Sequence, residues 1–280
     1  MVTPSPSYQT RVFPRSRRLV IDSSSWGRRH HTIHILAEFD VTEARHIVHE
    51  HATATGEKLS FTAYIAACIG RAVATDRNWH AYRKGKKLIL FDDVDIGILI
   101  DHEVEHERLA TIYVVRSAHT KSVREIHDEI RAAQRQRIED VAGVDRWLFF
   151  LSLPGFLRRL FYWWLDRSPE TRKRAAGTVL LTAPGMFGKG GGWGVPTTIN
   201  TLTVTTGGVA TKPGVVDGAI VPRDYLDMTI SFDHDVVDGG PAARFASCLR
   251  DIVESASLLT EFAALSPCRP AISTAEERRA

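Results

Sequence analysis

The sequence predicts an α/β protein, because segments with strand character alternate with segments with helix character along most of the chain. Near the N-terminus, a strand-like run at 32–39 precedes two helix-like runs at 41–55 and 60–75. Near the C-terminus, an apolar, β-rich run at 225–232 leads directly into a helix-like run at 241–259. The chain has 280 residues, of which 44% are apolar, so it can bury one sizeable core.

The helix expected at 60–75 has a start signal and a buried face. Ser60 is a suitable N-cap, because its hydroxyl oxygen can accept a hydrogen bond from a free N–H group of the first turn. Ile65, Ile69 and Val73 follow at helical spacing, which predicts that one side of this helix is buried.

Two further strands are expected at 95–100 and 110–115, on either side of the polar run 101–107. A charged hairpin tip is the common explanation of such a run, and a divalent-cation site is the alternative. Ser122 then opens an amphipathic helix that continues through Ala133.

A strand at 177–182 and a hairpin complete the expected sheet. The hairpin has strands at 201–209 and 225–232, and Asp217-Gly218 is suited to its turn. The glycine-rich run 188–194 lacks the Gly-Lys-Ser/Thr signature of a phosphate loop and leads into strands instead of a helix. We interpret it as a mobile loop.

Composition and charge exclude several classes of protein. The 36 basic and 33 acidic residues give a net charge of +3, which is too balanced to indicate nucleic-acid binding. The three cysteines are widely spaced without a Cys-x-x-Cys pair, so we expect reduced thiols in a cytoplasmic protein. Residues 1–10 lack the apolar core of a signal peptide. Residues 1–16 are expected to form a flexible basic arm and residues 266–280 a flexible tail.

An aromatic segment lies at 141–176. Pro154-Gly155 and a pair of arginines interrupt its apolar residues, so it is too broken to span a bilayer. Three interpretations compete: a hairpin packed in the core or between subunits, a lid over an apolar channel, and an interfacial membrane contact through 147–165. The four consecutive aromatic residues at its centre are not expected all to face water.

The motif with the clearest chemistry is His-x-x-x-Asp-Gly at 234–239, on the connection between an expected strand and helix. An imidazole whose second ring nitrogen is held by a neighbour can act as a general base near neutral pH, which predicts this role for His234. Asp238 precedes a glycine that permits a tight turn, and we interpret it as a carboxylate that holds the local structure. The alternative is a helix entry with an incidental histidine, because so short a pattern also arises by chance.

Six further histidines raise the question of a metal site; they are His30, His31, His34, His46, His49 and His51. Histidines at helical spacing can bind zinc. No cysteine joins them and no His-Glu-x-x-His pattern occurs, so we expect no metal site there.

Six blocks of residues occur in a recognisable order: Gly177-Thr178, Gly185-Met186-Phe187-Gly188, Val215-Val216-Asp217-Gly218, Phe232-Asp233-His234, Val236-Val237-Asp238-Gly239 and Pro241-Ala242-Ala243-Arg244-Phe245. In this order and spacing the chain resembles the catalytic domain of the dihydrolipoyl acyltransferases of 2-oxoacid dehydrogenase complexes, relatives of chloramphenicol acetyltransferase. The resemblance implies one two-layer domain over 17–265, a mixed sheet flanked by helices, in which the aromatic segment 141–176 is an insertion.

The resemblance also implies an activity, the direct transfer of an acyl group between coenzyme A and an acceptor thiol of the dihydrolipoyl type or another nucleophile, without a metal. His234 would take the proton of the acceptor, and the hydroxyl of Thr182 would donate a hydrogen bond to the oxyanion, a contribution of typically about 3 to 4 kcal/mol. A hydroxyl that caps its own backbone is the alternative for Thr182. Gly185, Met186 and Trp193 are expected to contact the substrate.

Family members form trimers in which the histidine and the oxyanion hydroxyl come from adjacent subunits. We therefore expect a homotrimer or a larger assembly built from trimers. A lipoylated protein is the expected partner, and the modest basic charge suits an anionic substrate such as coenzyme A.

Two departures from the family bear on function. The family generally has Arg after the motif histidine, whereas Asp235 stands here, and a carboxylate there should raise the pKa of His234 unless it points away. The candidates for a cation that pairs with Asp238 are Arg17, Arg18, Arg28 and Arg29. No lipoyl-bearing or subunit-binding domain is recognisable, so we expect a free-standing catalytic domain without a covalent lipoyl group. The alternative function is a non-catalytic oligomeric scaffold or membrane-docking protein on the same fold.

Overall fold

The computed structural model describes residues 8–14, 17–104, 107–135, 149–150, 152–188 and 190–263. A six-stranded mixed sheet in the order β1-β8-β7-β6-β4-β5 forms its centre, and a two-stranded ribbon accompanies it. The strands are β1 (Thr32–Asp40), β2 (Tyr82–Lys84), β3 (Lys87–Ile89), β4 (Ile96–Val104), β5 (Glu107–Val115), β6 (Val179–Thr182), β7 (Leu202–Val216) and β8 (Ala219–Asp233). β6 runs parallel to both of its neighbours, and the other pairs are antiparallel. The expected mixed sheet is confirmed.

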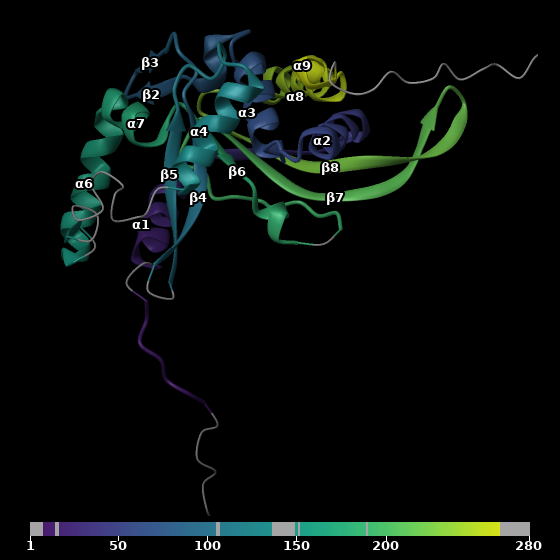
Figure 1. The fold of residues 1–280 in the computed structure, drawn as a ribbon. Coiled ribbons are helices and arrows are strands. Elements are labelled where there is room, and N and C mark those ends of the chain that lie inside the picture. The colour runs from purple at the N-terminus through teal and green to yellow at the C-terminus, as the bar shows by residue number, and fades with distance from the viewer. Residues whose placement is uncertain are drawn as a thin grey trace, which may run out of the picture.

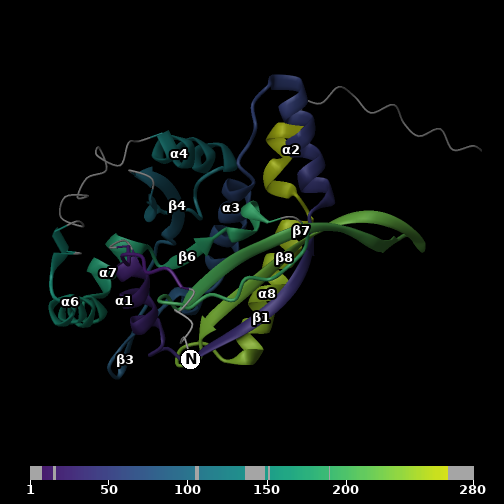
Figure 2. The same ribbon diagram turned by 90° about the horizontal axis from the view of Figure 1, so that it is seen from below.

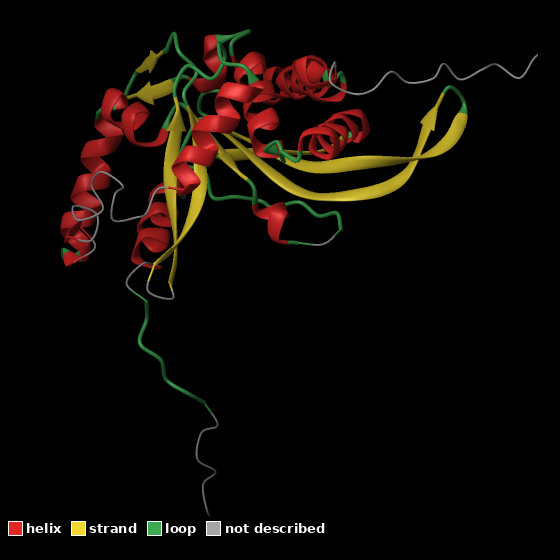
Figure 3. Cartoon of the chain, viewed as in Figure 1, coloured by secondary structure: helices red, strands yellow, loops and turns green. Residues whose placement is uncertain are grey.

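Helices α2, α3, α4 and α8 lie on one face of this sheet, whereas α1, α6 and α7 gather beside β4 and β5 (Figure 1, Figure 3). The helices are α1 (Arg17–Gly27), α2 (Thr42–Thr55), α3 (Phe61–Val73), α4 (Val123–Arg135), α6 (Gly155–Arg167), α7 (Pro169–Ala176), α8 (Gly239–Glu254) and α9 (Thr260–Ala263). Short 3-10 turns η1 (Arg77–His80), η3 (Pro184–Phe187) and η4 (Ser257–Leu259) connect some of them. The layers are thus helices over a sheet, as expected.

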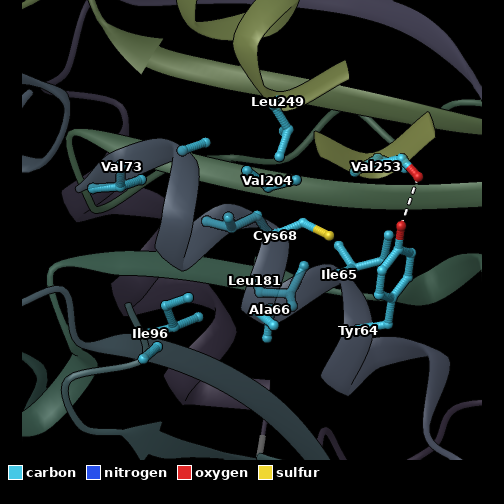
Figure 4. Close-up of a cluster of buried hydrophobic side chains, with 14 of the residues drawn as sticks. Tyr64, Ile65, Ala66, Cys68, Val73, Ile96, Leu181, Val204, Leu249 and Val253 are labelled. Atoms are coloured by element: carbon cyan, nitrogen blue, oxygen red, sulfur yellow. Dashed lines mark hydrogen bonds between the residues drawn. The ribbon is translucent and has the colours of Figure 1, made fainter. Parts of the chain in front are cut away.

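Helix α3 is the centre of the hydrophobic core. The hydroxyl of Ser60 accepts the N–H of Ala63 at 3.3 Å, which confirms the expected N-cap. Tyr64 is fully buried and its hydroxyl donates to the carbonyl of Val253 at 2.6 Å, which ties α3 to α8 (Figure 4). Cys68 lies among apolar side chains, and burial raises the pKa of its thiol to about 12. This cysteine is a packing residue.

The central strands alternate strictly between two faces. Leu181, Val204 and Ile230 form one row across β6, β7 and β8, and this row is buried beneath the helices. The next row, Thr182, Thr205 and Thr229, points to the opposite face, because successive side chains of a strand alternate. We call this opposite side the hydroxyl face.

Several elements extend further than expected. The hairpin strands continue to Val216 and from Ala219, around a turn in which Asp217 and Gly218 both have positive φ values of 50° and 78°. Their outer halves carry exposed, proline-containing sequence, which removes the alternation that marks a half-buried strand. Helix α8 is shorter than expected, because the chain turns at Ala256 with φ 50°. Helix α1 was not expected.

Some expectations fall outside the described residues. These are most of the arm at 1–16, the tail at 266–280 with Cys268, the side chains of the polar run 101–107, and residues 141–148 of the aromatic segment.

The segment after β6 crosses the hydroxyl face from β7 towards β1 (Figure 2). It lies on a β-bulge at Gly207-Gly208, where only glycines fit: a Cβ on Gly185 would lie 1.6 Å from the carbonyl oxygen of Gly207. The N–H of Gly208 donates to the carbonyl of Gly192 at 3.0 Å. The glycines expected in a mobile loop therefore allow two backbones to pack closely.

Because of this contact, Gly185 cannot be replaced without a shift of the backbone. Gly188 in the same segment can be replaced, since a Cβ on Gly188 would have its nearest neighbour at 4.0 Å. Gly185→Ala should lower the free energy of unfolding by about 1–3 kcal/mol through overpacking. Gly188→Ala should change it by less than about 0.5 kcal/mol. Urea denaturation of both variants measures the difference, and equal costs would contradict the close approach.

Candidate functional site

A buried carboxylate, Asp233, builds the turn between β8 and α8. Asp233 is 5% exposed, and its carboxylate accepts hydrogen bonds from His30 Nδ1 at 2.6 Å and from the backbone N–H of Asp235 at 3.1 Å. Its carbonyl oxygen accepts the N–H groups of Val236 and Val237, each at 3.0 Å. These bonds close the turn on itself, and the next side chain, His234, is left outside it.

His234 stands on the surface of the turn. Its side chain is 45% exposed, with Nδ1 3.6 Å from Oδ1 of Asp238, and its backbone N–H donates to the carbonyl of His31 at 2.7 Å. Asp238 is the N-cap residue of α8, where the helix dipole favours an anion. An imidazole that carries its proton on Nδ1, towards this carboxylate, presents an unprotonated Nε2 as a base. The geometry thus brings two of the three expected catalytic residues together.

The unusual Asp235 points away from His234. Its Oδ1 lies 2.9 Å from His31 Nδ1, and its Oδ2 accepts a hydrogen bond from Arg83 Nη1 on β2 at 2.5 Å. The hydrogen bond from His31, and the charges of His31 and Arg83, lower the pKa of the Asp235 carboxyl below its ordinary value. We call these three residues the Asp235 clamp. The arginine of this region therefore binds Asp235, whereas we expected one for Asp238.

Thr182 ends β6 on the hydroxyl face, and its side chain is partly exposed. The hydroxyls of Thr203, Thr205 and Thr229 lie on the same face, are buried, and have no hydrogen-bond partner in the part of the chain that the structure describes. Buried polar atoms nearly always bind a protein group, a water molecule or a ligand. The crossing segment covers this face close to Thr182, since a Cβ on Gly194 would lie 3.2 Å from Cγ2 of Thr205.

Thr182 and His234 are far apart within one chain. Thr182 is level with Thr229 of β8, and Asp233 lies four residues further along that strand. This separates the two sites by roughly 13 Å along the strand and roughly 10 Å across two strand spacings. Within one chain, the two side chains are therefore too far apart to contact one small reacting group.

The three expected substrate contacts belong to the crossing segment that follows Thr182. Gly185 supports the bulge, and Met186 lies in η3, with its side chain outside the described atoms. Trp193 is 40% exposed; its Nε1 donates to the carbonyl of Ala37 at 3.4 Å, and Lys212 Nζ lies 5.8 Å from the centre of its ring. None of the three adjoins His234 of the same chain in the contacts described.

Five of the six clustered histidines have different partners, which are Asp233 for His30, Asp235 for His31, Ser231 for His34, Glu50 for His46 and Glu57 for His51. Elsewhere, Glu57, His127 and Asp128 bring three potential ligand atoms within 4.8 Å of one another. The carboxylate of Glu57 already accepts a hydrogen bond from Arg124 at 2.6 Å, and Nδ1 of His127 accepts the backbone N–H of Ser60 at 2.9 Å. Among the described residues, Arg124 thus already supplies a positive charge to the Glu57 carboxylate of this group.

Four residues of the turn were missed as contributors, namely His30, His31, Arg83 and Asp233. Asp233 directly precedes the motif, and its place at the end of an apolar strand was the one available signal. Arg83 lies 152 residues before Asp235, so no local pattern connects the two.

Comparisons with known proteins agree on one family. A family model described as the 2-oxoacid dehydrogenases acyltransferase (catalytic domain) matches residues 28–142 and 169–261 and passes over most of the aromatic segment. The lipoamide acyltransferase component of the branched-chain alpha-keto acid dehydrogenase complex of Pseudomonas putida is 38% identical over 87 residues. That match covers 29% of this chain and 19% of the relative, so the chain aligns with only about a fifth of the relative's length.

Solved structures share the fold. A probable dihydrolipoamide acetyltransferase from Listeria monocytogenes has a TM-score of 0.67 at 18% identity, covering 90% of this chain and 96% of that one. The dihydrolipoamide acetyltransferase of Azotobacter vinelandii has a TM-score of 0.65 at 18% identity, covering 92% and 100%. Because the family model also matches well over half of its residues, this chain belongs to the family of 2-oxoacid dehydrogenase acyltransferase catalytic domains.

Proposed function

We propose that this protein transfers an acyl group between coenzyme A and an acceptor thiol of the dihydrolipoyl type. One observation carries the proposal. In the Azotobacter vinelandii enzyme, the residues investigated for their role in the catalytic mechanism are a serine, a histidine 52 residues later and an asparagine four residues after that histidine. Thr182, His234 and Asp238 repeat this spacing with a hydroxyl, an imidazole and a carboxylate.

Each residue has a chemical role in this reaction. Nε2 of His234 takes the proton of the acceptor thiol, and the sulfur attacks the carbonyl carbon of the acyl-coenzyme A thioester. The hydroxyl of Thr182 donates a hydrogen bond to the oxyanion of the tetrahedral intermediate. When the intermediate collapses, the sulfur of coenzyme A leaves and receives the proton from the imidazolium. Asp238 stabilises that cation from 3.6 Å without exchanging a proton.

The site lies between two subunits of a homotrimer in this proposal. The distance between Thr182 and His234 within one chain supports this arrangement, because these two side chains are too far apart to contact the same substrate atom. Thr182, whose side chain is partly exposed, would then face the turn of a neighbouring chain. A lipoylated protein would deliver the acceptor thiol.

Removal of the base tests the chemistry directly. His234→Ala should lower kcat by about 10² to 10⁴, and Thr182→Val by about 10² to 10³, because they remove the general base and one oxyanion donor. The measurement is chromatographic separation of free coenzyme A after incubation of acyl-coenzyme A donors with dihydrolipoamide. His49→Ala, at an exposed position of α2, is the matched control and should keep full turnover. Full turnover by His234→Ala would show that His234 is not the base, and no turnover by the wild type with any donor would favour the non-catalytic scaffold.

Mixing the two inactive variants tests the shared site. When His234→Ala and Thr182→Val chains are dissociated and reassembled together, about a quarter of the interfaces should pair an intact histidine with an intact threonine. Activity should therefore return to a measurable fraction of the wild-type value. No recovery in mixed assemblies of confirmed composition would show that both side chains act within one chain.

The Asp235 clamp predicts an effect on turnover and a pH-dependent effect on stability. Asp235→Asn should lower kcat several-fold and leave KM nearly unchanged, since it releases the turn without touching the substrate. Arg83→Met added to Asp235→Asn should lower kcat little further, because both substitutions remove the same ion pair.

The lowered pKa of Asp235 means that the clamp stabilises the fold above the ordinary value of 3.8, and that this stabilisation is lost as the pH falls through the lowered pKa. Urea denaturation across pH 3 to 7 should show the wild type and Asp235→Asn converging in acid, and a constant difference would contradict the clamp.

A further inference from the structure

Among the described residues, helix α6, in the segment that the family model passes over, packs against α1 by one side, and on its other side the ring of Phe161 lies 4.9 Å from that of Phe150. On the side towards α1, Arg158 Nε binds Asp22 Oδ2 at 2.6 Å, and both side chains are buried. The ring of Tyr162 lies 5.5 Å from the ring of Trp26, and Leu165 is also buried. A buried ion pair thus anchors a helix whose other side remains available.

The other side of α6 is apolar and exposed. We call it the aromatic face, and its residues are Phe156, Leu157, Leu160, Phe161, Trp163 and Trp164. Their exposed fractions range from 36% to 68%, in contrast to the usual burial of such side chains. All but Trp163 recur at intervals that put them on one side of a helix, and Trp163 lies at its edge. Contiguous exposure on this scale marks an interaction surface.

Basic residues are frequent in and after α6. Arg158 and Arg172 are buried and Lys173 Nζ lies 3.6 Å from Asp93 Oδ2, so the exposed cations are the arginines named below. Residues 152–176 contain six basic and two acidic residues, a net charge of +4, whereas the whole chain carries +3. The rest of the protein is therefore slightly acidic. Arg159, Arg167 and Arg174 are exposed, and the guanidinium of Arg167 lies 3.7 Å from the centre of the Trp163 ring.

We propose that the aromatic face docks α6 onto the surface of an anionic lipid bilayer. Tryptophan and phenylalanine on one side of a helix, with arginines at the border, are typical of helices that lie in the headgroup region of a membrane. The cations match the negative headgroups, whereas two copies of this segment facing each other would repel. The observations therefore favour lipid over a second copy of the chain.

The helix lies in the membrane plane in this arrangement. Its 13 residues extend roughly 20 Å, which is shorter than the roughly 30 Å hydrocarbon layer of a bilayer. Within the described part of the chain, no helix is long and apolar enough to cross a membrane. Docking does not depend on acyl transfer, and it would hold the domain at a surface with its other face directed to solution.

Vesicle sedimentation tests the proposal on the full chain. Wild-type protein should sediment with vesicles of phosphatidylcholine and phosphatidylglycerol, and much less with phosphatidylcholine alone. The double variant Phe156→Ser/Trp164→Ser should lower partitioning by about tenfold or more, because it removes apolar side chains that enter the membrane. The matched control, Leu88→Ser/Leu90→Ser, changes two leucines of similar exposure away from α6 and should sediment like the wild type.

Charge reversal gives an independent variant at exposed positions. Arg159→Glu/Arg167→Glu should also weaken sedimentation with anionic vesicles, and added salt should weaken that of the wild type. The proposal would be overturned if the wild-type protein did not sediment with anionic vesicles. It would also be overturned if Phe156→Ser/Trp164→Ser and Arg159→Glu/Arg167→Glu sedimented like the wild type. If vesicles fail to bind and Phe156→Ser/Trp164→Ser reduces the mass in analytical ultracentrifugation, the aromatic face is an interface between subunits.

Discussion

The alternation of β6, β7 and β8 between two faces is the constraint on which the rest of the structure depends. Because Leu181, Val204 and Ile230 must lie beneath the helices, the register of these strands is fixed. A change of the strand register by one residue would move Thr182 into the core and would exchange the two faces of β8 at its C-terminal end. The same register determines where the bulge falls and therefore where the glycine-rich segment crosses. Burial of apolar side chains on one face thus positions polar chemistry on the other.

The turn at the end of β8 shows how a change of charge can be absorbed by distant residues. A carboxylate beside a histidine would ordinarily favour the protonated imidazole, but Asp235 is held by His31 and Arg83. His31 acts twice, since its ring binds Asp235 and its carbonyl accepts the N–H of His234. The orientation of the His234 imidazole consequently depends on the start of β1 and on the β2-β3 ribbon. The dependence of an imidazole on its second-nearest neighbours is a general property of histidine sites.

Local patterns were sufficient to predict the central elements, because burial there imposes strict periodicity. The cap of α3 at Ser60, the strand at 32–39 and the turn at Asp217-Gly218 all carried their signals within a few residues. The outer hairpin and helix α1 carried none, since half-exposed segments tolerate almost any side chain. In the site, His234 and Asp238 were found because they share one motif. The Asp235 clamp was not, because it joins segments 152 residues apart, and the distance of Thr182 from His234 follows only from strand order.

The long hairpin of β7 and β8 extends well beyond the helices (Figure 1). Its tip exposes Val215 and Ile220, and a two-stranded ribbon is at best marginally stable in water. Neighbouring chains of the proposed homotrimer would supply the missing cover. The order of the ribbon would then depend on protein concentration, because association stabilises the folded form by mass action. Dilution would act on this protein as a mild denaturant, loosening first the tip of the hairpin and then the end of β8 at Asp233, next to His234.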